Sequence, residues 1–198
     1  VRQGDSLLID IAAGVAEATP RRLTMYRLRA DVAIAPAGVV VTRGTTDAPD
    51  GSLPDPRHQA LGWRFYGAPK GADNTDWTAL RVAHCIPETA IELIPDDSYP
   101  LEMGFERLHG VDFRKGCYVG QEVTARMKHK TVLRKGLVTV DISGAAPIGT
   151  PIMADGKEAG TLFTQHEDRA IAYLRYDRAT GPMQAGDAVV IWGGAPPR

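Results

Sequence analysis

The chain has 198 residues, of which 43% are hydrophobic and 24% are charged, and its formal net charge at pH 7 is -1. These values are typical of a globular protein with a core of useful size, and the charge excludes a general attraction to nucleic acid or acidic membranes. No apolar run approaches the roughly 18 residues that span a membrane, and no basic-then-apolar signal segment opens the chain. We therefore expect a cytoplasmic protein with no membrane partner.

The first elements predicted along the chain are a short strand and a helix. Apolar residues predict the strand over Ser6–Asp10. A domain rarely opens so abruptly, so we expect that residues are missing ahead of Val1. Thr19 and Pro20 suit the N-cap and the first position of a helix that continues to Ala30.

A hairpin, a further strand and a second helix are predicted next. The alternation in 31–35 predicts a strand, and Val39–Val41 is expected to be its hairpin partner. Leu61–Tyr66 predicts another strand. Apolar spacing predicts a helix over Asp76–His84, and Cys85 after it is expected to lie in the core. The apolar face of this helix is expected to comprise Trp77, Leu80 and Ala83.

After residue 130 the chain becomes rich in strand signals. The dipeptide Asp155-Gly156 is typical of a tight hairpin turn. Strands are predicted over Leu137–Ile142, Pro151–Ala154, Glu158–Thr164, Ala170–Tyr173 and Ala188–Trp192. Such short strands without a helix signal indicate a small antiparallel barrel or sandwich. We place a domain boundary near residue 133, between domains 1–132 and 133–198.

The two cysteines, Cys85 and Cys117, form no CxxC pair. This spacing argues against a disulfide framework, a structural zinc site and an iron–sulfur cluster held by this chain alone. Free thiols fit a reducing compartment. The histidines show no HExxH or comparable ligand spacing, so we expect no metal site.

One segment carries more information than the rest, Lys115-Gly116-Cys117-Tyr118-Val119-Gly120-Gln121-Glu122. Its glycines permit close approach of a ligand, and a helix-compatible run with Gln121 and Glu122 in its first turn follows. Cys117 would lie at or just before the start of this helix and near Lys115, which favours a reactive thiolate. The alternative is that Cys117 is a small apolar plug beneath the loop.

This segment is similar to the signature of YgfZ-type proteins, the folate-binding relatives of the glycine-cleavage T-protein in the aminomethyltransferase superfamily. Further segments resemble the family in the same order along nearly the whole chain: Leu28-Arg29, Asp55-Pro56-Arg57, Leu61-Gly62-Trp63-Arg64, Ile86-Pro87-Glu88 and Pro100-Leu101-Glu102. The resemblance implies an α+β fold, in which an N-terminally truncated aminomethyltransferase folate-binding domain is followed by a small antiparallel β-barrel.

The same resemblance implies an accessory protein for iron–sulfur cluster assembly or repair that uses tetrahydrofolate as its cofactor. Its partners would be client proteins or the assembly machinery, and we expect a monomer. Cys117 would be the reactive, catalytic group. The residues expected to bind folate are Lys115, Gly116, Tyr118, Gly120, Gln121, Glu122, Arg64, Trp63 and Arg126; Trp63 would stack on the pterin.

Two other functions stay open from the sequence. The first is a folate-dependent aminomethyltransferase or methyltransferase, although Cys117 and Gln121 stand where true T-proteins carry an acidic residue and an arginine. The second is a tRNA-modification factor, in which a basic cluster binds RNA phosphates. The cluster comprises Arg126, Lys128, Lys130, Arg134 and Lys135; it could equally bind the glutamate tail of folate or be a solvated helix end.

Overall fold

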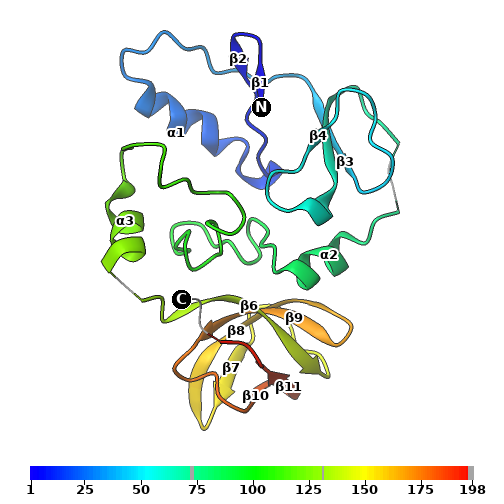
Figure 1. The fold of residues 1–198 in the computed structure, drawn as a ribbon, viewed down its shortest axis with the longest axis vertical. Coiled ribbons are helices and arrows are strands. Elements are labelled where there is room, and N and C mark those ends of the chain that lie inside the picture. The colour runs from blue at the N-terminus through cyan, green and yellow to red at the C-terminus, as the bar shows by residue number, and fades with distance from the viewer. Residues whose placement is uncertain (72–73, 131, 196–198) are drawn as a thin grey trace. The chain divides into compact units, whose positions relative to one another are not determined.

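The structure, a computed structural model, describes residues 1–71, 74–130 and 132–195. It divides into two compact units, which are described separately. Unit 1 comprises Val1–Asp55 and Gly62–Asp73, and unit 2 comprises Pro56–Leu61 and Asn74–Arg198. Figure 1 shows the elements of both units along the chain.

Unit 1 is built around a small antiparallel sheet. Its elements are β1 (Arg2–Gln3), β2 (Ser6–Leu7), η1 (Ala13–Val15), α1 (Ala18–Arg27), β3 (Val40–Gly44), β4 (Leu53–Pro54) and β5 (Trp63–Gly67). The strand order is β3-β5-β4, and Val40 pairs with Gly67 at one end of the β3–β5 ladder. Strands β1 and β2 form a separate hairpin in which Leu7 is exposed.

The predicted hairpin between residues 31–35 and 39–41 is wrong. The first segment forms no strand, and β3 pairs instead with β5. The carbonyl of Val32 accepts a hydrogen bond from the Arg27 guanidinium at 3.0 Å, and the Val32 amide donates to the Ala30 carbonyl at 3.0 Å. These backbone groups are therefore satisfied without a ladder, and alternation alone could not identify the distant partner of β3.

The first helix also begins differently from the prediction. Its N-cap is Glu17, and Thr19 lies inside the helix, where its hydroxyl donates to the Val15 carbonyl at 2.8 Å. Pro20 is still within the first turn, where its missing amide leaves no bond unmade. The predicted strand over Ser6–Asp10 shortens to β2, and beyond it only Leu8 extends the hairpin, through hydrogen bonds with Val1 at 2.7 and 2.8 Å.

Unit 2 consists of an antiparallel barrel, two helices, of which the first packs on the barrel, and a long irregular segment. Its elements are η2 (Gln59–Leu61), α2 (Trp77–His84), α3 (Gln121–Lys130), β6 (Lys135–Ser143), β7 (Pro151–Ala154), β8 (Lys157–His166), β9 (Arg169–Arg175), β10 (Pro182–Ala185) and β11 (Ala188–Ile191). Within the described residues, six strands close in the order β10-β11-β6-β9-β8-β7. The barrel prediction is confirmed; β10 was not predicted.

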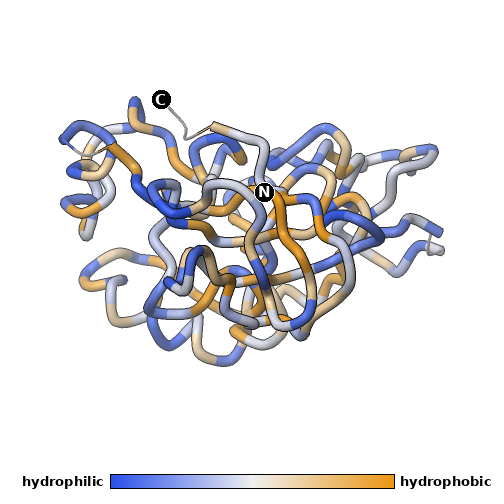
Figure 2. The backbone as a smooth tube through the Cα atoms, turned by 90° about the horizontal axis from the view of Figure 1, so that it is seen from below, coloured by the Kyte–Doolittle hydropathy of each residue, from blue (hydrophilic) through white to orange (hydrophobic). Residues whose placement is uncertain are grey.

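Alternating side chains fill the barrel. The buried cluster includes Ile152, Leu162, Leu174, Met183 and Val190. The turn between β7 and β8 is the predicted Asp155-Gly156, and both residues have positive φ, as a tight two-residue hairpin requires. Figure 2 shows hydrophobic and hydrophilic segments interspersed along the backbone. Among the described helices, none is long and apolar enough to cross a membrane.

Helix α2 lies against the barrel through an unexpected face. Val82 packs with Phe163 of β8 and Ile171 of β9. The predicted apolar face is wrong at Ala83, which is exposed, whereas Arg81 is buried beside Val82. A hydrophobicity pattern cannot identify a buried arginine, because its burial depends on a partner from elsewhere in the chain.

That partner is Glu92, whose side chain is 0% exposed. Its carboxylate accepts hydrogen bonds from the Arg81 guanidinium, from the Thr164 hydroxyl of β8 and, at 2.8 Å, from the Glu88 amide. The Arg81 Nη1 also lies 3.0 Å from Glu88. This network joins α2, the 86–98 segment and the barrel.

An imidazole pair lies at the end of α2. The ring centroids of His58 and His84 are 4.3 Å apart, and the Arg107 guanidinium donates to the His84 carbonyl at 3.0 Å. Burial lowers the pKa of His84 below its usual value, and the charges of His58 and Arg107 lower it further. The neutral ring is therefore favoured in the native state.

Candidate functional site

The Lys115–Glu122 segment forms an exposed loop that leads directly into α3. Gly116 and Gly120 have φ of 89° and 88°, a conformation that other residues rarely adopt. The side-chain oxygen of Gln121, the first residue of α3, accepts a hydrogen bond from the Tyr118 amide at 3.0 Å. The glycines and this cap together set the path of the loop ahead of the helix.

Phe113, which precedes the loop, contacts the last turn of α3. The Phe113 ring lies edge-on to His129, with 6.2 Å between centroids, and the Lys128 ammonium lies 5.3 Å from the Phe113 ring centre. Lys128 also pairs with Glu106 at 2.6 Å. Because Phe113 is anchored on the last turn of α3, the loop between them is held at both ends.

Cys117 lies in this loop and is exposed. Around it, Val119 is 88% exposed, and the Lys115 ammonium lies 4.5 Å from the centre of the Tyr118 ring. The apolar-plug alternative is thus wrong for Cys117, since a plug would be covered. The loop presents a thiol, a cation and apolar side chains together at the surface.

The surroundings of Cys85 differ from those of Cys117. Cys85 follows α2 in a left-handed conformation and packs against Val82, Phe163 and Ile171. Burial raises the pKa of its thiol to about 11. The core position predicted for Cys85 is confirmed, and its thiol is unsuited to act as a nucleophile or a metal ligand, which must be a thiolate.

Trp63 and Arg64 belong to unit 1, where they lie on β5. The Arg64 Nε is 2.7 Å from the Asp55 carboxylate, and its Nη1 pairs with Asp10, which also accepts from the Tyr66 hydroxyl at 3.2 Å. Burial alone lowers the pKa of Arg64, but the hydrogen bond to Asp55 and the two carboxylate charges raise it overall. The guanidinium therefore stays charged.

Trp63 is 8% exposed, and its indole N–H donates to the Thr46 carbonyl at 3.0 Å. Its stacking role remains a prediction, as do the folate contacts of Arg64 and the loop residues. Glu122 and Arg126 are exposed on α3. The structure thus brings the residues from Lys115 to Arg126 together in unit 2, whereas Trp63 and Arg64 form a separate group in unit 1.

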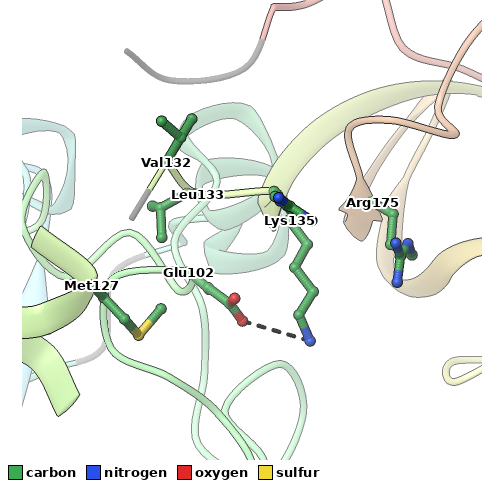
Figure 3. Close-up of a pocket in the computed structure, with 7 residues that line it drawn as sticks. Glu102, Met127, Val132, Leu133, Lys135 and Arg175 are labelled. Carbon is green, nitrogen blue, oxygen red and sulfur yellow. Dashed lines mark ion pairs between the residues drawn. The ribbon is translucent and has the colours of Figure 1, made fainter. Parts of the chain in front are cut away.

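The residues of the predicted basic cluster have different surroundings in the structure. Lys128 is paired with Glu106, whereas Arg134 and Lys135 line a pocket of about 290 Å³ in unit 2 (Figure 3). Arg175, from the end of β9, lines the same pocket, as do Glu102 and Met127. Sequence reasoning missed these three residues, because no spacing in the sequence connects positions 102, 127 and 175.

No group of three histidine, cysteine, aspartate or glutamate side chains that could hold a metal ion occurs in the described part of the chain. Cys117 therefore belongs to no three-ligand group within the part of the chain that the structure describes.

Comparisons with known proteins place the barrel and the whole chain among related sequences. Residues 134–193 match the family described as CAF17, C-terminal beta-barrel domain. The chain is similar to "Iron-sulfur cluster assembly factor IBA57, mitochondrial" of Mus musculus, with 30% identity over 210 residues that cover 90% of this chain and 59% of the relative. The human protein of the same name is 28% identical over 207 residues, covering 89% of this chain and 58% of its own.

A fungal relative, "Iron-sulfur cluster assembly factor IBA57 homolog, mitochondrial" of Mycosarcoma maydis, is 34% identical over 131 residues, or 61% of this chain and 32% of its own. The chain thus spans about three fifths of the length of the two mammalian relatives. The chain is thus similar to named iron–sulfur cluster assembly factors, and its barrel matches the CAF17 C-terminal domain family, whereas the narrower YgfZ-type assignment remains an interpretation.

The expected cytoplasmic location is wrong by this comparison, since the relatives are named as mitochondrial proteins. The prediction rested on free thiols and on apolar patterning. Unpaired cysteines indicate a reducing environment but do not distinguish one reducing compartment from another.

Proposed function

We propose that this chain is the part of an iron–sulfur cluster assembly or repair factor that carries its reactive thiol, Cys117, and binds tetrahydrofolate. The observation that carries the proposal is the exposure of Cys117 on a glycine-flanked loop, while Cys85 is partly buried against the core. The similarity to named assembly factors supports the same function class. The exposure points to the Cys117 thiol as the chemical group that this surface offers.

The number of thiolates that this chain supplies determines how it can bind an iron–sulfur cluster. Iron–sulfur clusters are held by several cysteine thiolates, and the thiolate is the form that binds metal. Cys117 supplies one such ligand, and the described residues contain no group of three side chains that could complete a metal site. A cluster that contacts this loop therefore takes its other ligands from a partner protein, so that the cluster is cargo in transit.

The loop suits a contact of this kind. Val119 and Tyr118 are exposed apolar side chains next to the thiol, and Lys115 adds a positive charge close to it. Apolar and aromatic side chains favour protein contacts, while a cation favours a negatively charged thiolate-bound cluster. A partner would be recognised by the loop and would bring the cluster to Cys117.

A complementation experiment tests the thiol. Cells that lack the full-length protein would receive the wild type, Cys117→Ala or Cys85→Ala, and aconitase activity would be measured relative to protein amount. We expect the wild type and Cys85→Ala to restore activity and Cys117→Ala to fail at equal abundance. Full restoration by Cys117→Ala would remove the thiol from the proposal, and no dependence of aconitase on the protein would refute the assembly function.

Folate binding is proposed on the resemblance in the Lys115–Glu122 segment, and Arg126 is its most testable member. Arg126 is exposed on α3, so its replacement should not disturb the fold. We expect calorimetric titration of the full-length protein with tetrahydrofolate to show weaker binding for Arg126→Gln and no change for the exposed control Arg29→Gln. Equal affinity for the two variants would remove Arg126 from the site, and no measurable binding by the wild type would refute the cofactor.

A further inference from the structure

The pocket of unit 2 has an apolar wall and a basic rim. Met127 of α3 with Val132 and Leu133 forms the apolar wall. Arg134, Lys135 and Arg175 form the basic rim. Figure 3 shows the Lys135 side chain extending toward Glu102, with Arg175 beside it on β9. Three positive charges and one negative charge thus line a space next to apolar carbon.

The one carboxylate in the lining is already engaged. The Tyr173 hydroxyl donates to the Glu102 carboxylate, and Glu102 is 7% exposed. The backbone carbonyl of Glu102 accepts a hydrogen bond from the amide of Leu137 in β6 at 2.8 Å, which holds Glu102 next to that strand. Lys135 lies 4.0 Å from the carboxylate, the outer limit of an ion pair. Glu102 therefore neutralises the rim only in part.

The basic rim contains a hydrogen-bond donor that has no acceptor among the described residues. The Nη2 of Arg175 pairs with Asp177 at 3.2 Å, but its Nε is buried and meets no acceptor in the described part of the chain. A buried N–H without an acceptor is disfavoured, so a movement of the Arg175 side chain that brings this N–H to an anion in the pocket would be favoured. The Arg134 side chain is exposed and has no ion pair or hydrogen bond among the described residues.

We propose that this pocket binds a small organic anion, a carboxylate carried on an apolar body. The basic rim would bind the carboxylate, and the apolar wall would cover the body. A guanidinium offers paired donors that match the two oxygens of a carboxylate. The volume of about 290 Å³ lies at the lower end of ligand pockets, which corresponds to a ligand no larger than a bicyclic aromatic acid. This site is distinct from Cys117 and does not depend on the proposed assembly function.

Two probes of equal shape separate charge from apolar contact. We would titrate the full chain with 2-naphthoate and with its neutral counterpart 2-naphthamide, and follow binding by calorimetry. The carboxylate is expected to bind saturably and about tenfold or more tighter than the amide, because a hydrogen bond to a charged group is stronger than one to a neutral group. Raising the salt concentration from about 0.05 M to about 0.5 M should weaken the carboxylate alone, since the rim is partly exposed.

Matched variants locate the site. Arg175→Gln and Arg134→Gln each remove one rim charge, whereas Arg169→Gln removes an exposed charge at the opposite end of the same strand, β9. We expect the two rim variants to lower naphthoate affinity about fivefold to tenfold and the control to leave it unchanged. Because Arg134 has no partner to lose, its variant should keep the thermal midpoint of the wild type.

Four outcomes would overturn the proposal. They are no saturable binding of naphthoate, equal affinity for naphthamide, an equal loss in Arg169→Gln, or no loss in Arg134→Gln and Arg175→Gln. The first shows that no site exists, the second that the pocket is merely apolar, and the last two that the anion binds elsewhere. None of these results bears on whether Cys117 is needed for aconitase activity, so the two proposals can fail separately.

Discussion

Replacing Arg81 by methionine is expected to destabilise unit 2 by about 3–5 kcal/mol, because it leaves a buried carboxylate without its cation. Glu92 is the carboxylate concerned, and its side chain is 0% exposed. Methionine keeps most of the volume and the apolar contacts of the arginine stem. The predicted loss therefore reports the charge and its hydrogen bonds rather than a cavity.

The magnitude follows from what remains around Glu92. The Thr164 hydroxyl and the Glu88 amide still donate to it, but both are neutral. Hydrogen bonds to a charged group contribute about 1.5–3 kcal/mol each, and Arg81 also donates to the Ile86 carbonyl at 3.1 Å. Loss of the guanidinium thus removes one charged partner and leaves a second acceptor unsatisfied.

Urea-induced unfolding followed by far-UV circular dichroism measures the change. The control is Arg21→Met, which breaks the pair between Arg21 and Glu17, whose side chains are 79% and 88% exposed. That variant should change the free energy of unfolding by less than about 0.5 kcal/mol. A second test combines Arg81→Met with Glu92→Leu, which should recover most of the loss because no unpaired charge remains.

A loss below about 1 kcal/mol for Arg81→Met would show that the buried ion pair contributes little to stability, and the reasoning would be refuted. A double variant as unstable as the single one would show that packing, rather than the unpaired charge, sets the cost.

Three further predictions concern a thiol, a histidine and a glycine. At pH 8, a thiol reagent should label Cys117 quickly and Cys85 only after denaturation, since burial raises the pKa of Cys85 to about 11; a fast thiol remaining in Cys117→Ala would contradict this. The pKa of His84 is lowered in the native state, so below about pH 6.5 the unfolded chain binds a proton more readily than the native protein does. The free energy of unfolding should therefore fall as the pH drops below about 6.5 and should not depend on His84 above that pH. His84→Gln should flatten that fall in urea titrations at pH 7.5 and 5.5, and an unchanged slope would refute it. Gly160→Ala would place a Cβ 2.0 Å from a β9 carbonyl and should lower the thermal midpoint by several degrees, whereas Gly14→Ala meets nothing within 4 Å and should leave it unchanged.

The sequence by itself determined the features that depend on neighbouring residues. The Asp155-Gly156 turn, the strands beside it and the helix after Gly120 were all predicted, because turn chemistry, alternation and helix periodicity act over a few positions. The same locality made the Lys115–Glu122 loop visible as a glycine-flanked cysteine segment. The sequence left open whether Cys117 in this loop is exposed, since exposure depends on what packs against it.

The tertiary structure alone decided the pairings between distant residues. It paired β3 with β5 rather than with its neighbour, buried Arg81 against Glu92, and brought Arg175 beside Lys135 around one pocket. Each of these depends on a partner that lies many residues away, and the residue alone gives no signal of it. Local propensity differs by less than about 1 kcal/mol between alternatives, so a single long-range pair is enough to override it.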